Sequence, residues 1–266
     1  MHIFSQYSVW ALWSPILAAV LVLTAVLYLK KEGTSARRKT FFLSALALIY
    51  LAAGSPFSLF ARDDLFTAFM VQQSILYLVV PPFLIIGTPL SWLRPLLWQA
   101  SLKKVFRVLT YPWLTAILFN PGFSVFLLPS VFRPIHASPV ALGAVEIFFF
   151  AAAVFMWWSI LSPLPELNPL SELQRIFYLF LTALMLTPIA MLMLFSHHNL
   201  YPAFANSPYL SAIYDQQIGG GVLKGFQLTA YGIELAYLIS GWFRSEREKE
   251  QEEQRGRKVV PIKKVR

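Results

Sequence analysis

Stretches of about twenty residues with few or no charged side chains recur along this chain, separated by short polar or basic segments. A helix of that length crosses the roughly 30 Å hydrocarbon core of a bilayer. Lipid offers the backbone no hydrogen-bond partners, so each stretch is expected to be a helix. The pattern predicts an all-α integral membrane protein, a seven-transmembrane-helix bundle. The predicted spans are 9–29, 41–60, 65–87, 111–132, 140–161, 176–195 and 221–243.

Some of these spans carry irregular features. The fourth is the weakest, because residues 120–122 (Asn-Pro-Gly) interrupt its apolar run. Pro81 and Pro82 in the third span and Pro188 in the sixth are expected to kink their helices. The first span has no basic segment before it and no small-residue cleavage site after it. It is therefore expected to be a retained span and not a signal peptide.

Composition agrees with this class. Apolar residues make up 57% of the 266 positions and charged residues 13%, whereas soluble domains carry about 25% charged residues. A soluble single-domain enzyme is therefore excluded. The chain has no cysteine, which excludes disulfides, thiolate metal sites and iron–sulfur clusters. It contains no nucleotide-binding loop and no HExxH or GxSxG motif, so we do not expect an enzyme.

Basic residues set the predicted orientation. The segments on one predicted side hold nineteen Lys and Arg, and those on the other hold three, Arg62, Arg133 and Lys224. The positive-inside rule places the richer side in the cytoplasm, with the N-terminus outside and the C-terminus cytoplasmic. The net charge of +9 then reports orientation, and no nucleic-acid partner is expected.

The predicted domains are a membrane domain, 1–243, and a charged cytoplasmic tail, 244–266. Within the first, an amphipathic helix is expected near 96–109, with Trp98, Leu102 and Phe106 on one face and basic residues between them. The tail is expected to be a frayed helix followed by a disordered segment. Both regions would lie near anionic lipids, although charge that only sets topology and solubility would look the same.

Polar residues inside predicted spans are costly and mark candidate sites. Gln72, Gln73 and Glu146 fall in the outer third of the bundle, and Glu234 falls near mid-membrane in the last span. The carboxylates would serve a proton relay or substrate site, or be structural acids that are protonated or hydrogen-bonded to a neighbour such as Gln72.

Thioether and imidazole groups gather on the same predicted outer side. Met favours Cu(I), and all four histidines are predicted to be external. The alternative is that the histidines are solvated and the methionines pack in the core. Adjacent His197 and His198 would point about 100° apart on a helix and could not both face one ion. The residues considered for copper are Met70, Gln73, Glu146, Met191, His197 and His198.

The run Asp215-Gln216-Gln217 precedes the last predicted span and has two interpretations. It is either a functional site or a helix cap, since Asp is a common N-cap and the glycines at 219–221 suit a tight turn. The other residues considered functional, outside the copper set, are Gln72, Asp215, Gln216, Gln217 and Glu234.

Four stretches carry a family resemblance. They are 54–57 (GSPF), 69–73 (FMVQQ) with 80–89 (VPPFLIIGTP), Glu146 with 156–163 (MWWSILSP), and 215–220 (DQQIGG). In these stretches the chain resembles the CtaG-type assembly factors of bacterial caa-type cytochrome c oxidase, seven-span membrane proteins. The likeness covers roughly residues 50–225, and the DQQ run is its most specific part.

The resemblance has one departure. Members of that family carry His-Met-x-Gln-His in the third span and often His-x-x-Glu-His in the fifth. Here those histidine positions hold Phe69, Gln73, Gly143 and Ile147, while the frame around them, including Glu146, is kept. The chain thus resembles a divergent member of the family, one that lacks the intramembrane histidines.

The resemblance implies a multi-pass protein of the bacterial plasma membrane that aids assembly or maturation of a terminal oxidase by contact with oxidase subunits. Copper handling at the outer face is a subordinate hypothesis. The alternatives are a small-molecule or ion carrier that uses the intramembrane carboxylates, and a metal-free membrane scaffold.

Overall fold

The computed structural model describes residues 12–30, 32–89, 91–92, 94–95, 99–162, 164 and 170–259. Every element of regular structure in this part is a helix. Among the predicted features, His2, the start of the first span and Trp98 lie outside the described residues, as do residues 260–266.

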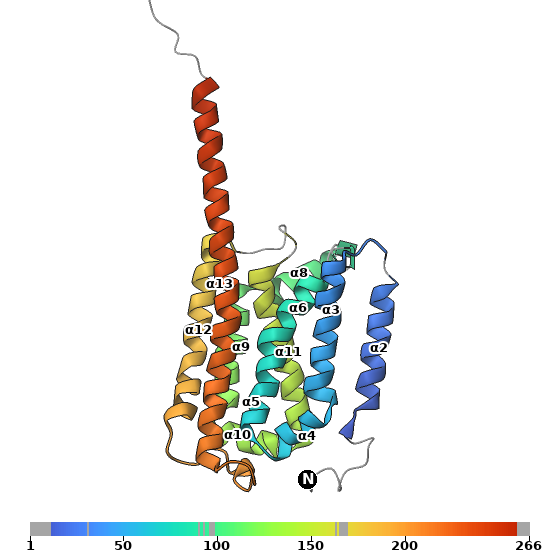
Figure 1. Ribbon diagram of the computed structural model, residues 1–266, viewed down its shortest axis with the longest axis vertical. Helices are drawn as coiled ribbons and strands as arrows, with labels where there is room; N and C mark the ends of the chain where they lie inside the picture. Colours follow the sequence, from blue (N-terminus) through green and yellow to red (C-terminus); the bar gives the residue numbers. More distant parts are fainter. Residues whose placement is uncertain are drawn as a thin grey trace, which may run out of the picture.

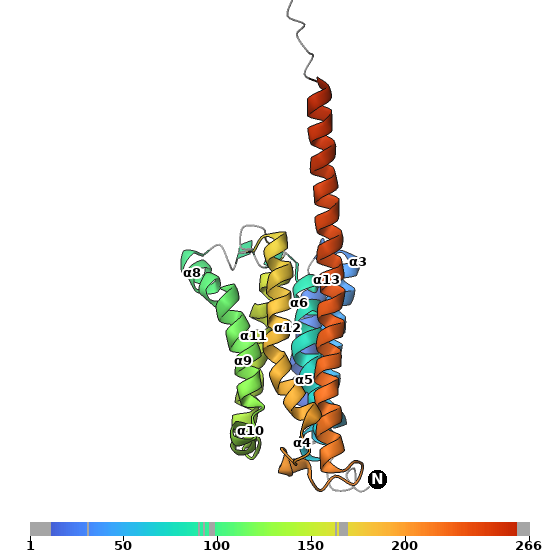
Figure 2. The same cartoon turned by 90° about the vertical axis from the view of Figure 1, so that its left-hand side faces the viewer.

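Long helical rods run side by side and alternate in direction (Figures 1 and 2). The rods and short helices, in chain order, are α2 (Pro15–Leu29), α3 (Ala36–Ile49) with η2 (Tyr50–Gly54), α4 (Pro56–Asp63), α5 (Phe66–Ser74) with η3 (Ile75–Val79) and α6 (Val80–Gly87), α8 (Ala100–Leu109), α9 (Pro112–Phe126), α10 (Pro129–His136), α11 (Pro139–Leu161), α12 (Glu172–Phe195), η5 (Pro202–Phe204) and α13 (Ala212–Val259).

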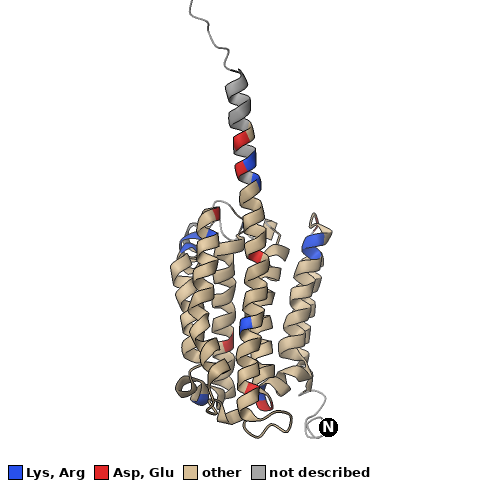
Figure 3. Ribbon diagram, turned by 60° about the vertical axis from the view of Figure 1, so that its left-hand side comes forward, with Lys and Arg blue, Asp and Glu red and all other residues tan. Residues whose placement is uncertain are grey.

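The bundle has two distinct ends. Helix α8, the α2–α3 connection and the start of α12 lie at one end, which we call the α8 end (Figure 1). Helices α4 and α10 and the segment before α13 lie at the other, the α10 end. The basic residues of α3 and α8 stand at the α8 end (Figure 3), so the fold gathers segments that were predicted to share one side of the membrane.

Three described helices are long and apolar enough to cross a bilayer: Phe66–Gly87, Pro139–Leu161 and Glu172–Phe195. The number rises to five if each of two bent pairs is one span. These pairs are Ala36–Gly54 with Pro56–Asp63, bent by 50°, and Pro112–Phe126 with Pro129–His136, bent by 81°. The structure therefore confirms an all-helical fold with three to five candidate spans.

The expected interruption at 120–122 does not occur. Helix α9 runs through Asn120 and Pro121 and ends at Phe126, and the bend follows there. The buried Asn120 side chain donates from Nδ2 to the Ala116 carbonyl at 3.1 Å and to Met156 Sδ at 3.4 Å. These contacts hold the polar side chain inside the bundle, so it does not mark a break.

At two places a proline leaves a helix carbonyl without its backbone hydrogen-bond donor, and a side chain from another part of the chain donates to that carbonyl instead. A proline has no N–H for the carbonyl four residues earlier. Pro56 follows the π-helical η2, and Gln72 Nε2 donates to the Ala52 carbonyl at 2.9 Å. Pro81 and Pro82 follow the π-helical η3, and Trp157 Nε1 donates to the Tyr77 carbonyl at 3.1 Å. The helix irregularities are thus locked by neighbouring helices.

The last helix is longer than the predicted span. Helix α13 continues past Phe243 to Val259 and leaves the bundle at the α8 end (Figure 2). The hydropathy change near 243 is therefore not a change of secondary structure. Helix α8 lies within the predicted amphipathic segment, and its Leu102, Val105 and Leu109 side chains are exposed.

Candidate functional site

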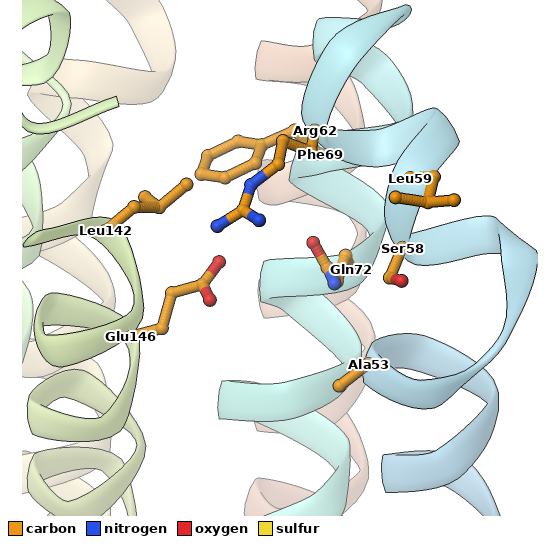
Figure 4. Close-up of a pocket in the computed structure, with 8 residues that line it drawn as sticks. All are labelled: Ala53, Ser58, Leu59, Arg62, Phe69, Gln72, Leu142 and Glu146. Atoms are coloured by element: carbon orange, nitrogen blue, oxygen red, sulfur yellow. The ribbon is translucent and has the colours of Figure 1, made fainter. Parts of the chain in front are cut away.

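A cavity of about 130 Å³ lies near the α10 end, where the predicted outer polar residues meet. Helices α4, α5 and α11 supply most of its walls, and polar and apolar side chains alternate around it (Figure 4). Its lining residues are Ala53, Ser58, Leu59, Arg62, Phe69, Gln72, Leu142 and Glu146.

The carboxylate of Glu146 is the centre of this site. Gln73 Nε2 donates to Glu146 Oε1 at 2.8 Å, across the α5–α11 contact. The Arg62 guanidinium points toward the same carboxylate (Figure 4) and interacts with it electrostatically. Gln73 is fully buried, and its Oε1 has no hydrogen-bond partner among the described residues. The sequence predicted both residues in the outer third and named Gln72 as the neighbour of the carboxylate. The structure instead pairs Glu146 with Gln73 and adds Arg62, which was not predicted.

An aromatic wall closes one side of the cavity. Phe69 lies edge-on to Phe132, with ring centroids 5.5 Å apart, and His136 stacks on Phe132 at 5.0 Å. His136 Nε2 donates to the Arg62 carbonyl at 3.0 Å. Burial lowers the pKa of His136, which favours the neutral ring. The position that is histidine in the resembled family, Phe69, is here part of an apolar wall.

Asp215 makes a helix-capping contact, although not the one that the sequence indicated. Helix α13 begins at Ala212, so Asp215 lies in its first turn and does not cap it. Its two carboxylate oxygens instead accept from the backbone N–H groups of Phe66 and Thr67, at 2.7 and 2.8 Å. Asp215 therefore caps helix α5 from another helix, and a carboxylate suits the positive end of the α5 dipole.

Gln216 and Gln217 fix the segment before α13. Gln216 Oε1 accepts from the Leu200 backbone N–H at 2.8 Å, and its Nε2 donates to the His198 carbonyl at 2.8 Å. Gln217 Nε2 donates to the Ser196 carbonyl at 3.2 Å. The motif therefore holds the connection between α12 and α13 against α5.

The predicted tight turn at 219–221 is also wrong. These glycines are helical, and they allow α13 to approach α5 and α12 closely. A Cβ at Gly219 would stand 2.8 Å from the Phe66 ring, and one at Gly220 would stand 2.9 Å from Met193 Cβ. The absence of a side chain at these glycines allows close helix packing and does not serve to reverse the chain.

The residues considered for copper have separate surroundings. Met70 is fully buried and packs toward Gly219, whereas Gln73 bonds Glu146. Met191 is half-buried, and His197 and His198 are exposed. Within the described part of the chain, no three His, Asp or Glu side chains form a group that could hold a metal ion.

Two charged residues lie elsewhere than predicted. Glu234 interacts electrostatically with Arg175 in the first turn of α12, so it lies toward the α8 end and not near mid-membrane. Lys224 was counted with the basic residues of the outer side, at the start of the predicted span 221–243. It stands twelve residues inside α13, where its Nζ donates to Thr187 Oγ1 at 2.7 Å and Gln227 Oε1 at 2.8 Å.

Sequence reasoning missed Arg62, His136 and Lys224 as members of polar clusters. Arg62 lines the cavity, and His136 contacts the Arg62 carbonyl, because α4 and α10 turn across the α10 end. For Lys224 a local signal existed, because Lys224 and Gln227 are three residues apart and share a helix face.

Comparison with known proteins identifies the family. A family model described as the cytochrome c oxidase caa3 assembly factor matches residues 8–245. The comparisons with curated proteins and with solved structures give no match. The family match covers nearly all of the 266 residues. The chain therefore belongs to the cytochrome c oxidase caa3 assembly factor family.

Proposed function

We propose that this protein assists the assembly or maturation of a respiratory terminal oxidase through contact with oxidase subunits in the membrane. The family match over residues 8–245 carries the proposal. Three described helices that are long and apolar enough to cross a bilayer support a contact within the membrane. We assign no catalytic role, and the polar contacts at the α10 end serve to hold a scaffold in shape.

The proposal includes a topology. The chain would cross the bacterial plasma membrane seven times, with the α10 end outside and the α8 end facing the cytoplasm. The support is the alternating direction of the rods and the basic residues of α3 and α8 at one end (Figure 3). Because the chain has no cysteine, single substitutions His198→Cys and Lys104→Cys test this with a membrane-impermeant maleimide. Labelling of His198→Cys alone in intact cells is expected, and the reverse result would overturn the orientation.

Deletion and complementation test the function. Cells that lack the protein are expected to lose assembled oxidase, measured as subunit abundance and oxidase spectrum in isolated membranes. Wild-type protein should restore both. Glu146→Gln keeps the shape of the site, whereas Glu146→Leu leaves the buried Gln73 amide without its acceptor and should restore less. Glu172→Gln, at an exposed position, is the matched control. Unchanged oxidase after deletion would overturn the proposal.

Copper handling at the outer face stays a subordinate proposal. The cavity lining offers Glu146 and the Gln72 amide as donors, and Gln73 bonds Glu146 from beside it. The Arg62 guanidinium stands opposite the carboxylate. A fixed cation beside the carboxylate opposes a second cation there. These residues do not fit a resident Cu(I) site, for which thioether and imidazole donors are preferred.

A Cu(I) titration of the purified protein beside a Met70→Leu/Glu146→Gln variant decides this point. Tight binding that the variant loses would establish a copper site made from these residues. Absence of binding in both proteins would leave the metal-free scaffold, which the contacts favour. The carrier alternative would need a pathway that joins Glu146 to Glu234, and the lining of the described cavity does not include Glu234.

A further inference from the structure

Lys224 lies at mid-depth along the bundle axis and not at either end. It stands twelve residues after the start of α13, roughly 18 Å along the helix axis. Its Nζ contacts the Ala183 carbonyl at 3.5 Å and Thr187 Oγ1 at 2.7 Å. Both residues belong to the middle of α12 (Glu172–Phe195). The ammonium group is therefore held at the mid-depth of a candidate membrane span.

The charge of Lys224 is not balanced by the groups that bind it. Its hydrogen-bond partners are a hydroxyl, an amide oxygen and a backbone carbonyl, and all three are neutral. Glu234 lies ten residues further along α13 and interacts with Arg175. A lysine within a bilayer is costly and is usually paired with an opposite charge. The side chain is only partly buried, so a group from outside the chain can reach it.

The same edge of the helix pair carries an apolar groove. A groove of about 660 Å³ lies between α12 and α13, and Phe177, Phe180, Leu235 and Ile239 are among its lining residues. Thr187 follows Phe180 by seven residues and Lys224 precedes Leu235 by eleven, spacings that keep residues on one helix face. The groove and the Lys224 cluster thus form one surface, which we call the α12–α13 seam.

We propose that the α12–α13 seam binds a transmembrane helix of an oxidase subunit, whose carboxylate side chain at mid-depth pairs with Lys224. This inference rests on the proposed function and names the docking surface for it. Charge complementarity selects the occupant. A lipid keeps its charged headgroup at the membrane surface, whereas a spanning helix can bring a carboxylate to the depth of Lys224. Exposed Phe180, Leu184 and Leu228 beside the seam supply the apolar contact.

Site-specific photo-crosslinking in native membranes tests the proposal. A benzophenone amino acid replaces Phe180 or Leu228 beside the seam, or Ile117 on α9 as an exposed control. The full-length protein is expressed in cells that make the oxidase, and the captured proteins are identified by mass spectrometry. Both seam positions are expected to capture the same oxidase subunit, identified by mass spectrometry. The α9 position is not expected to capture it. Capture of lipid alone, or equal capture of that subunit from α9, would overturn the proposal.

Substitution at Lys224 tests the charge pairing. Lys224→Met keeps the length of the side chain and removes its charge, and it is expected to lower capture from Phe180 roughly tenfold. Lys224→Arg keeps the charge and should retain capture. Thr187→Val is the matched control, because it removes one neutral partner of Lys224. Gel filtration in detergent and thermal unfolding check that each variant is folded.

The outcomes separate this inference from the proposed function. If Lys224→Met restores oxidase in the deletion strain and retains capture from the seam, the inference is wrong while the assembly role stands. If deletion leaves the oxidase unchanged, the assembly role itself is wrong. If Lys224→Met is folded and loses both capture and oxidase, the seam is the docking surface.

Discussion

The α10 end and the α12–α13 seam differ in the partners that they give to charged side chains. At the α10 end, Asp215 accepts from two backbone N–H groups, and Glu146 meets the Gln73 amide and faces the Arg62 guanidinium. At the seam, the partners of Lys224 are neutral oxygens, and exposed apolar side chains flank it. At the α10 end these two carboxylates have hydrogen-bond or charged partners within the chain. At the seam the positive charge of Lys224 has only neutral hydrogen-bond partners among the described residues, so an opposite charge from another protein can pair with it.

This difference indicates which region is scaffold and which is interface. Buried polar groups that are hydrogen-bonded within the chain make a structure rigid and specific, and at the α10 end Asp215 and Glu146 are bonded in this way, although Gln73 Oε1 has no partner among the described residues. A charged group at mid-depth with neutral partners costs stability unless something binds it. The α10 end, which we call the closed region, should therefore govern the stability of the isolated protein. The seam should govern association and contribute little to stability.

The largest expected effect is at Asp215. Asp215→Ala removes both acceptors at the start of α5 and leaves the Phe66 and Thr67 N–H groups without partners. A hydrogen bond to a charged group contributes about 1.5–3 kcal/mol, so the free energy of unfolding should fall by about 3 kcal/mol or more. Unfolding in mixed detergent and SDS measures the change.

Two controls define the origin of that loss. Asp215→Asn keeps one oxygen and should lose about half as much. Asp63→Ala removes an exposed carboxylate near the same end and should change stability by less than about 0.5 kcal/mol. Equal losses for Asp215→Ala and Asp63→Ala would show that the cap is not what stabilises α5.

The second effect compares two glycines of α13, one in each region. Gly219→Ala would bring a methyl group to 2.8 Å from the Phe66 ring, in the closed region, and should cost about 1–3 kcal/mol. Gly225, beside Lys224, has no heavy atom within 4 Å of an added Cβ. Gly225→Ala should be neutral or stabilising by about 0.5 kcal/mol, because alanine favours the helix.

The same unfolding measurement applies to both glycine variants. Opposite signs at the two positions would sharpen the contrast between a packed region and an open seam. A loss at Gly225 as large as that at Gly219 would mean that the α13 face at Lys224 is packed in the isolated protein, against the proposed open surface.

Much of the fold could be predicted, because membrane spans are encoded by local composition. The predicted spans 65–87, 140–161 and 176–195 coincide with the three long candidate spans. The bends could not be predicted, because they depend on contacts from other helices, such as Gln72 to Ala52. The interruption expected at Asn120 failed because Met156, on another helix, accepts from its side chain.

The candidate site was predictable only in part. Gln73 and Glu146 were predicted to lie at a similar depth, in the outer third of the bundle. That depth did not identify them as hydrogen-bond partners, which the structure shows. The Asp215 run was predicted to be either a functional site or a cap of the last span, and the helix that Asp215 caps in the structure begins 149 residues away in sequence. The depth of Lys224 was not predicted, because the last helix begins at Ala212, nine residues before the start of the predicted span. Local sequence encodes depth and helix propensity, whereas long-range contacts decide which groups meet.

The smallest expected effect concerns His136, at the aromatic wall of the closed region. Burial holds the pKa of His136 below its ordinary value of 6.5. The hydrogen bond to the Arg62 carbonyl and the charge of Asp63 oppose this shift, whereas the charge of Arg62 adds to it. The folded state therefore prefers the neutral ring. Its stabilising effect is complete above pH 6.5 and is lost as the pH falls below that value towards the folded pKa. His136→Gln keeps a donor for the Arg62 carbonyl but cannot titrate, so its unfolding should depend less on pH below 6.5. His197→Gln, at an exposed position, should retain the wild-type dependence. If both variants follow the wild-type curve, His136 is not held neutral by the aromatic wall, and the α10 end is more open to water than its contacts indicate.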